Sequence, residues 1–327
     1  MVWPKVSIVI FANADPGGCV RILTDCERLQ HEELEFEVVL VLQGLTDKVE
    51  ALLKDYQFSF DLKFVSVDKS SNRAQGRNRG VGVSKHEIIL FLESTLEVTP
   101  ELLYRHLEAY EKKSTVAVMG EVQSPAFVKK SRWFRYLDGD YRATRRWAAR
   151  TGSQTSPPLR YVNTSNFSVR KATIESFGGY AEDIDHPEAE DIDLAHRISA
   201  QSTSNIHYEP EAIAYCLHPS LHTTLVQKHA FGREGVPKLL EIYPELYSVL
   251  PSRFVKIPGF PDVSPLYRAF MNLLFTAPFF FLARGIRLFS PEVISYRMMR
   301  YMLQAESVKG LKTFLKEKRQ TPSNRRG

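Results

Sequence analysis

The sequence predicts an α/β protein, in which a mostly parallel β-sheet is flanked by helices and followed by a helical, membrane-leaning C-terminal extension. Three observations support this prediction. Short apolar runs alternate with segments of helical periodicity over the first 120 residues. The runs are apolar at consecutive positions, which is typical of strands that are buried on both faces. The last third of the chain changes to an uncharged stretch that is followed by basic segments.

Five runs rich in β-branched and aliphatic residues predict the strands of the first half, at 5–11, 36–42, 62–67, 87–92 and 115–122. The spacing of apolar and polar residues predicts helices between them, at 22–29, 49–56, 69–85 and 99–110. In the last of these, Thr99 before Pro100 is typical of a helix start, with Thr99 as the N-cap. Ligands of such sheets bind beyond the carboxyl ends of the strands, so the residues just after each strand are the candidates for a site.

The segment 125–160 combines aromatic side chains with many arginines and lacks a clear period. One interpretation is a helical excursion that packs its aromatic residues inward. The other is a surface on which Trp133 and its neighbours stack on sugars or bases. Asp138 and Asp140 form an Asp-x-Asp pair here, but no strong strand precedes them, so they are poor metal candidates.

A strand at 166–170 and a short helix that ends at Gly178-Gly179 come next. The following helix, 188–198, carries four carboxylates at its head: Glu188, Glu190, Asp191 and Asp193. Carboxylates stabilise a helix N-terminus, which explains such a cluster without any function. The functional interpretation is a general base that takes a proton from an acceptor hydroxyl.

The charge distribution separates the end of the chain from its body. The net charge is +5, but residues 253–327 hold 14 Lys and Arg against 4 Asp and Glu, a net of +10. The uncharged run 269–283 contains Pro278 and is shorter than the roughly 20 residues of a spanning helix. We expect an interfacial or re-entrant segment on an anionic membrane surface, which we favour over a nucleic acid. A helical hairpin packed on the body of the protein is the alternative.

The location of the protein follows from its cysteines and its start. Cys19, Cys26 and Cys216 have neither the pairing of a disulfide framework nor the spacing of a metal site, which indicates a reducing compartment. The first residues have neither the basic start nor the small-residue cleavage site of a signal peptide. We therefore expect a cytoplasmic protein, peripheral on the inner face of the membrane.

Taken together, the segments from about residue 4 to 235 resemble an inverting family 2 glycosyltransferase with the GT-A fold, a Rossmann-like architecture. The resemblance rests on "VSIVIFAN", "NRAQGRNRGVGVS", "IILFLEST" and the block "NTSNFSVRKATIESFGGYAED" followed by "EAEDIDLAHRI". It implies that residues 1–124 bind a nucleotide sugar and that 125–235 bind the acceptor, whereas 236–327 form the basic helical C-terminal region. The implied activity is transfer of a sugar to a hydroxyl of a glycan or lipid-linked acceptor, in the synthesis of cell-surface polysaccharide or glycolipid.

The resemblance also assigns roles to residues. Asp191 becomes the catalytic base, with Glu190 beside it. The implied donor-binding residues are Asn13, Gln43, Arg73, Arg77, Asn78, Glu93 and Thr95. The implied acceptor-binding residues are Trp133, Asn166, Gly178 and Gly179.

The sequence departs from the family at the metal-binding position and at the position that contacts the base of the nucleotide. Thr95 stands in place of the metal-binding carboxylate of the Asp-x-Asp motif, and Gln43 stands where the family has an acidic residue. Three hypotheses follow. Arginines such as Arg73, Arg77 and Arg79 serve the diphosphate without a metal. Alternatively, Glu93 and His218 hold Mg²⁺ or Mn²⁺ weakly, unless His218 only caps a backbone carbonyl. The third hypothesis is a non-catalytic GT-A-like binding or scaffold protein at the membrane.

Overall fold

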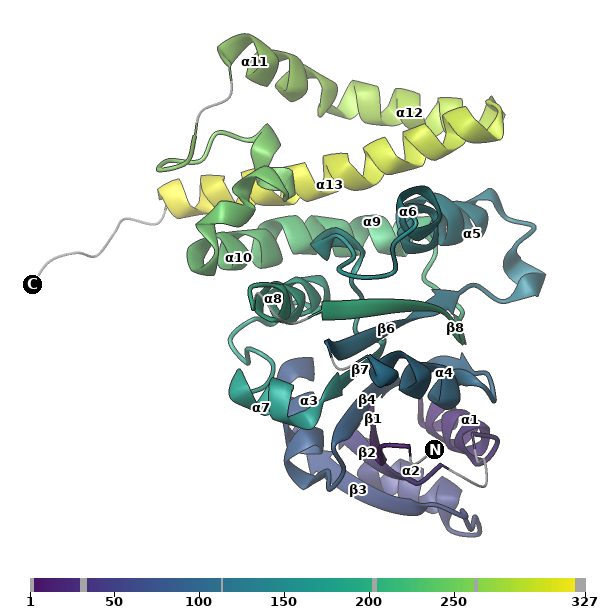
Figure 1. Cartoon of the computed structure of the whole chain (residues 1–327). Coiled ribbons are helices and arrows are strands. Elements are labelled where there is room, and N and C mark those ends of the chain that lie inside the picture. Colours follow the sequence, from purple (N-terminus) through teal and green to yellow (C-terminus); the bar gives the residue numbers. More distant parts are fainter. Residues whose placement is uncertain (1–2, 30–33, 113, 202–204, 262–263, 321–327) are drawn as a thin grey trace, which may run out of the picture. The chain divides into compact units, whose positions relative to one another are not determined.

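The computed structural model describes residues 3–29, 34–112, 114–201, 205–261 and 264–320 (Figure 1). The chain divides into two compact units, Met1–His218 and Pro219–Gly327. This division by packing lies at 218/219, whereas the sequence predicted the start of a separate C-terminal region at 236. The assignment of 1–124 and 125–235 to donor and acceptor stays a prediction.

The strands of the first unit form one sheet in the order β3-β2-β1-β4-β7-β6-β8-β5. Their bounds are β1 Val6–Ala12, β2 Phe36–Gln43, β3 Asp61–Val67, β4 Ile88–Glu93, β5 Leu96–Val98, β6 Thr115–Gln123, β7 Asn166–Arg170 and β8 Asn205–Cys216. The strands β3, β2, β1 and β4 pair in parallel, as do β6 and β8. The strands β7 and β5 run antiparallel to their neighbours, so the sheet is mixed.

Helices cover both faces of this sheet. They are α1 Pro16–Glu27, α2 Thr46–Leu53, α3 Arg73–Val83, α4 Leu102–Glu108, α5 Arg132–Tyr136, α6 Thr144–Thr151, α7 Lys171–Ser176 and α8 Pro187–Ser199. Short 3₁₀ or π-helical turns lie at η1 Ala109–Glu111, η2 Ala126–Val128, η3 Leu137–Tyr141 and η4 Leu159–Tyr161. Alternate residues of β1 enter two cores: Ile8 packs with residues of α1, α2 and α4, and Val9 with residues of α3, α7 and α8. Because both faces are covered, the central strands are apolar at nearly every position.

The predicted α/β class is confirmed, and each predicted strand is present to within one residue at either end. The helix bounds were predicted less well: α1 begins at Pro16 and α2 at Thr46, earlier than the expected 22 and 49. The start of α4 was also wrong. The helix expected to begin at Thr99 begins at Leu102, because the hydroxyl and amide of Thr99 donate to the carbonyl of Ile213 instead of capping the helix. The short strand β5 was not predicted, since three residues give too little pattern to detect.

The second unit is helical. It contains α9 Leu221–Ala230, η5 Phe231–Gly235, α10 Val236–Ile242, η6 Pro244–Ser248, η7 Pro251–Phe254, α11 Pro265–Leu274, α12 Ala277–Phe289 and α13 Glu292–Gln320. Helix α13 lies along α9, η5 and α12 (Figure 1). Two glycines allow a close approach: a Cβ on Gly232 would come within 1.8 Å of the Ser307 carbonyl oxygen, and one on Gly310 within 2.0 Å of that of His229.

Candidate active site

The centre of the candidate site joins α3 to the head of α8. The buried guanidinium of Arg77 donates to Oε1 of Glu190 at 2.8 Å and to the hydroxyl of Thr164 at 2.9 Å. Thr164 in turn donates to Oδ1 of Asp191, which lies 3.9 Å from the same guanidinium. Glu190 is 2% exposed and Asp191 is 14% exposed. Asp191 is therefore the carboxylate of this pair that can meet a substrate.

Local sequence explains the position of Arg77. Asn72 caps α3 by accepting from the amide of Gln75, whose side chain accepts from the amide of Asn72. Gly76 lets the helix approach the sheet, since a Cβ there would lie 2.4 Å from the ring of Phe11. The helix then presents Arg77 inward, where its guanidinium stacks 5.0 Å from the centroid of the Tyr180 ring.

Burial sets the acidity of the two carboxyls. It raises the pKa of Glu190 to about 7 and that of Asp191 to about 6, although the positive charge of Arg77 acts in the opposite direction on both. A carboxyl whose pKa lies near neutrality is a stronger base than an ordinary aspartate and is still ionised in part at pH 7. The head of α8 therefore has both the geometry and the acidity of a general base.

Asn78 connects α3 to the loop that precedes α8. Its amide nitrogen donates to the Tyr180 carbonyl and to Glu182, each at 2.9 Å, and its oxygen accepts from the Tyr180 amide at 2.8 Å. Gly179, at φ +87°, leaves the room for this contact, since a Cβ would lie 2.4 Å from Oδ1 of Asn78. Gly178 also has a positive φ, +74°. These predicted site residues thus shape the loop that carries Tyr180.

The predicted donor residues at the strand ends are arranged around α3. Arg73 donates to Oε1 of Glu93 at 2.5 Å, and Arg77 lies 3.6 Å from the same oxygen. Burial alone would raise the pKa of Glu93, but the positive charges of Arg73, Arg77 and Arg142 outweigh it and hold that pKa below its ordinary value. Thr95 is exposed.

The remaining predicted site residues make no direct contact with Arg77, Glu190 or Asp191 among the hydrogen bonds of the described residues. Gln43 donates to the carbonyls of Lys69 and Ser71, so it braces the loop before α3, and Asn13 is exposed at the end of β1. Asn166 is buried, where it donates to the carbonyls of Glu121 and Ala212 and contacts His106. Trp133 is 5% exposed and packs against Tyr136, which agrees with the inward-packing interpretation of the 125–160 segment.

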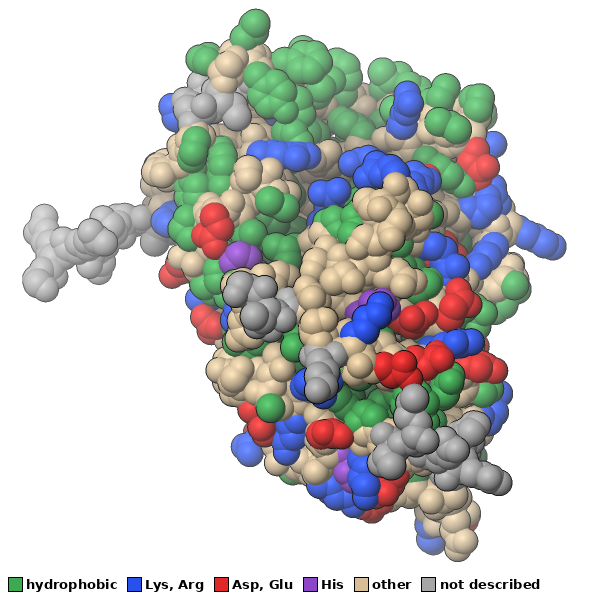
Figure 2. All heavy atoms as spheres, viewed as in Figure 1, with side chains coloured by type: hydrophobic (Ala, Val, Ile, Leu, Met, Phe, Trp, Pro, Cys, Tyr) green, Lys and Arg blue, Asp and Glu red, His purple; other side chains and the backbone are tan. Residues whose placement is uncertain are grey.

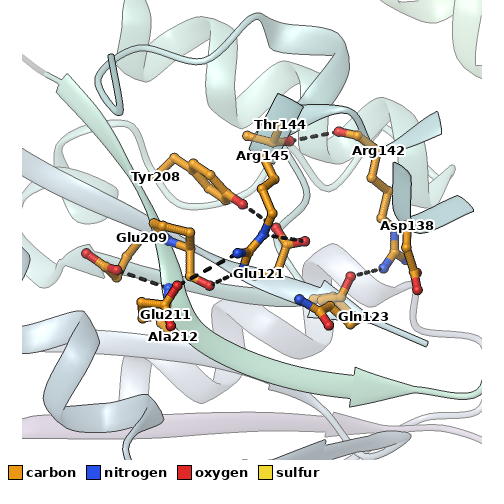
Figure 3. Close-up of polar contacts among 12 residues, drawn as sticks. Glu121, Gln123, Asp138, Arg142, Thr144, Arg145, Tyr208, Glu209, Glu211 and Ala212 are labelled. Carbon is orange, nitrogen blue, oxygen red and sulfur yellow. Dashed lines mark hydrogen bonds and ion pairs between the residues drawn. The ribbon is translucent and has the colours of Figure 1, made fainter. Parts of the chain in front are cut away.

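The proposed metal ligand His218 is engaged by an arginine that the sequence did not single out. Nη2 of Arg142 lies 3.2 Å from Nδ1 of His218, and because a guanidinium only donates, this nitrogen accepts. The proton is then on Nε2, which is buried and has no hydrogen-bond partner among the described residues. Figure 3 shows Arg142 reaching the end of β6 beside Gln123 and Asp138, while Arg145 turns toward Glu121.

The residues at the expected metal position do not fit a divalent cation. The Glu93 carboxylate is occupied by Arg73, Nδ1 of His218 by Arg142, and Thr95 offers no carboxylate. Within the described part of the chain, no three His, Cys, Asp or Glu side chains are grouped as a metal site. A cation here would have to displace guanidinium groups, and the positive charge of Arg142 would repel it.

Three site residues were not predicted. Thr164 and Tyr180 lie inside the block that carried the resemblance, so their positions were visible although their contacts were not. Arg142 is one of several arginines in an irregular segment, and nothing in the sequence distinguishes it from Arg145 or Arg146.

Comparisons with known proteins agree on one family, the glycosyltransferases. A family model described as glycosyl transferase family 2 matches residues 8–176. An uncharacterized glycosyltransferase of Bacillus subtilis, YfnE, is 26% identical over 116 residues, which cover 36% of this chain and 29% of the relative. The chain thus matches less than a third of that relative's length.

Solved structures show the same fold. The mannosyltransferase PcManGT from Pyrobaculum calidifontis, in complex with GDP-Man and Mn²⁺, superposes with a TM-score of 0.58 at 14% identity, over 94% of this chain and 87% of that one. Mannosyl-3-phosphoglycerate synthase from Rubrobacter xylanophilus superposes with a TM-score of 0.51 at 12% identity, over 79% of both chains. At such identities the likeness concerns the fold.

Proposed function

The chain belongs to glycosyl transferase family 2, and from that premise we propose that it moves a sugar from a nucleotide-sugar donor to a hydroxyl of an acceptor, with inversion. The observation that carries this proposal is the head of α8. There Asp191 is partly exposed, is held by the Thr164 hydroxyl, and has its pKa raised to about 6 by burial. A chain that only served as a scaffold would have no need of such a base.

The proposed reaction is one displacement. The acceptor oxygen attacks the anomeric carbon and forms the new C–O bond, while its proton passes to a carboxylate oxygen of Asp191. The bond from the anomeric carbon to the diphosphate breaks on the opposite face, and its electron pair leaves with the diphosphate oxygen. Glu190 and Arg77 are not consumed; they fix Asp191 in place and set its basicity.

On the donor side, we propose that the nucleotide lies at the carboxyl ends of β1, β2 and β4, where Asn13, Gln43 and Glu93 stand. Arg73 and Asn78 border the same region from α3. The structural neighbour from Pyrobaculum calidifontis holds GDP-Man, so GDP-sugars are the first donors to test, with UDP-sugars tested beside them. Trp133, Asn166, Gly178 and Gly179 belong to the proposed acceptor half, in which the two glycines shape the loop beside Asp191.

We also propose that the second unit binds an anionic membrane surface, which favours a lipid-linked or surface-polysaccharide acceptor. Figure 2 shows hydrophobic side chains gathered over α11 and α12, with Lys and Arg among them. Leu266 is 82% exposed and Phe289 is 90% exposed. Among the described helices none is long and apolar enough to cross a membrane alone, whereas α11 and α12 pass that test together, with a bend of 56°.

The experiment is a donor screen with the full chain. Release of nucleoside diphosphate is measured for UDP- and GDP-sugars with lipid-linked and oligosaccharide acceptors, and the anomeric configuration of the product is read by NMR. Asp191→Asn should lower the rate by about 10²- to 10⁴-fold, as expected for loss of a general base. Glu188→Gln, which removes the same charge one turn earlier in α8, is the matched control. A wild-type chain that binds no nucleotide and turns over no donor would favour the scaffold hypothesis.

A further inference from the structure

The two positions at which this chain was expected to hold a metal are both occupied by arginine side chains. Arg73 and Arg77 neutralise Glu93, and Arg142 occupies Nδ1 of His218. Thr95, in place of a carboxylate, is neutral. Arginine side chains of the protein thus supply positive charge at this end of the sheet. The surroundings of each guanidinium indicate what it does there.

Arg77 and Arg142 have different surroundings. Arg77 is 2% exposed, and its guanidinium forms an ion pair with the Glu190 carboxylate at 2.8 Å. Arg142 is half-buried and donates to the Val122 carbonyl, at 2.7 Å, and to neutral His218. Within the described residues it forms no ion pair with a carboxylate. Its positive charge is therefore not neutralised by a direct ion pair. It also acts on Glu93, whose pKa it helps to lower.

The backbone beside Arg142 is held in an unfavourable conformation. Ala143, which follows it, has φ +32°, a region that residues other than glycine rarely adopt and that costs on the order of 1 kcal/mol. Thr144 stabilises this turn, since its hydroxyl donates to the Arg142 carbonyl at 2.8 Å. Anchoring at Val122 and His218 and a strained turn together fix the guanidinium at the ends of β6 and β8. Such strain is typical of positions where placement of a side chain matters.

We propose that the guanidinium of Arg142 binds the diphosphate of the donor in the place where other members of the family would use a divalent cation. The proposal rests on the proposed function. A guanidinium offers several N–H donors in a plane and stays charged, so it suits phosphate oxygens and the charge that develops on a departing diphosphate. His218 acts as a positioning residue: burial lowers its pKa to about 3, so the ring stays neutral and keeps accepting from Arg142.

The test is calorimetric titration of the full chain with UDP and with GDP, in buffer that contains EDTA and in buffer that contains Mn²⁺. The wild type should bind one of them in EDTA with an affinity within about threefold of that in Mn²⁺. Arg142→Gln should weaken binding in EDTA by about ten- to hundredfold, the usual effect of hydrogen bonds to a charged group. Arg142→Lys should fall between the two, because it keeps the charge but loses the planar donors.

Arg150→Gln is the matched control, since it removes the same charge from an exposed position at the end of α6 and should leave binding unchanged. Circular dichroism and the thermal midpoint check that each variant is folded, and His218→Leu should weaken binding less than Arg142→Gln. Strict dependence on Mn²⁺, with Arg142→Gln equal to the wild type, would overturn the inference and leave the proposed function standing. Absence of binding in both buffers would overturn both.

Discussion

Arg77 donates to Glu190 across 2.8 Å, and each side chain is only 2% exposed, although the two residues are 113 positions apart in the sequence. The pair connects α3 with α8, the two helices that carry the proposed donor and base residues. Burying two charges is costly, so such a pair adds little net stability by itself. Removing one partner is different, because the other charge then stays buried without compensation.

Arg77→Met should therefore lower the free energy of unfolding by about 3–5 kcal/mol. The loss has two sources: Glu190 and Asp191 lose the positive charge between them, and the Thr164 hydroxyl loses its donor. Urea unfolding followed by circular dichroism measures the change. Arg79→Met, an exposed position on the same helix, should stay within about 0.5 kcal/mol of the wild type. A small effect of Arg77→Met would mean that the buried pair is not formed in solution.

The hydroxyl of Thr164 should set the pH dependence of transfer. The base acts in its ionised form, so the rate should rise with pH through the region of the raised pKa values, about 6 for Asp191 and about 7 for Glu190. The hydrogen bond from Thr164 stabilises the ionised form of Asp191 and lowers its pKa. Thr164→Val removes that bond, so the pKa should rise and the ascending limb should move up by about one pH unit.

The measurement is kcat/KM against pH for whichever nucleotide sugar supports turnover. Thr151→Val, which removes an exposed hydroxyl from α6, should leave the profile in place. A limb that moves toward lower pH in Thr164→Val would show that Asp191 is not the titrating group.

The sequence allowed the sheet to be predicted well because burial on both faces leaves a strong pattern. The strands β1, β2 and β4 are apolar at nearly every position, and each was located to within one residue. The antiparallel pairing of β7 between β4 and β6 could not be read from that pattern. Strand direction depends on where long connections bring the chain back, and these connections leave no period in the sequence.

The site was predictable where one motif carries several of its residues. Glu190 and Asp191 follow from the head of α8, and Arg77 with Asn78 from the glycine-rich helix. Arg142 could not be predicted, because its position depends on the π-helical turn η3 and on the positive φ of Ala143. No residue type in the sequence marks either feature. A positive φ is usually adopted by glycine, so an alanine at position 143 gives no hint of it.

The crossing of α13 over η5 depends on glycine in the second unit. Gly310→Ala should place a Cβ 2.0 Å from the His229 carbonyl oxygen and 2.9 Å from the amide nitrogen of Arg233. Since both neighbours are backbone atoms, the helices must separate, and we expect a loss of about 1–3 kcal/mol. Thermal unfolding should show a lower midpoint.

Gly285→Ala is the control for that change and should act in the opposite direction. Gly285 lies in α12, and a Cβ there would meet no atom within 4 Å. Alanine in a helix is more favourable than glycine by up to about 1 kcal/mol, so the midpoint should stay or rise. Equal losses in both variants would contradict the prediction, because they would show that the close approach at Gly310 does not decide the result.

The exposed apolar face of α12 should determine binding to membranes. Phe281 and Phe289 are 64% and 90% exposed, and Arg284 lies exposed between them. Replacing both phenylalanines with glutamate should reduce flotation of the full chain with phosphatidylglycerol vesicles at least about tenfold, because each buried phenylalanine contributes roughly 1.5–3 kcal/mol. Phe127→Glu changes an exposed phenylalanine of the first unit and is the matched control. Flotation of the wild type should also weaken with added salt, since the arginines act through screened charge. If flotation is unchanged in the double variant, α12 does not mediate membrane binding, and the binding belongs to another surface.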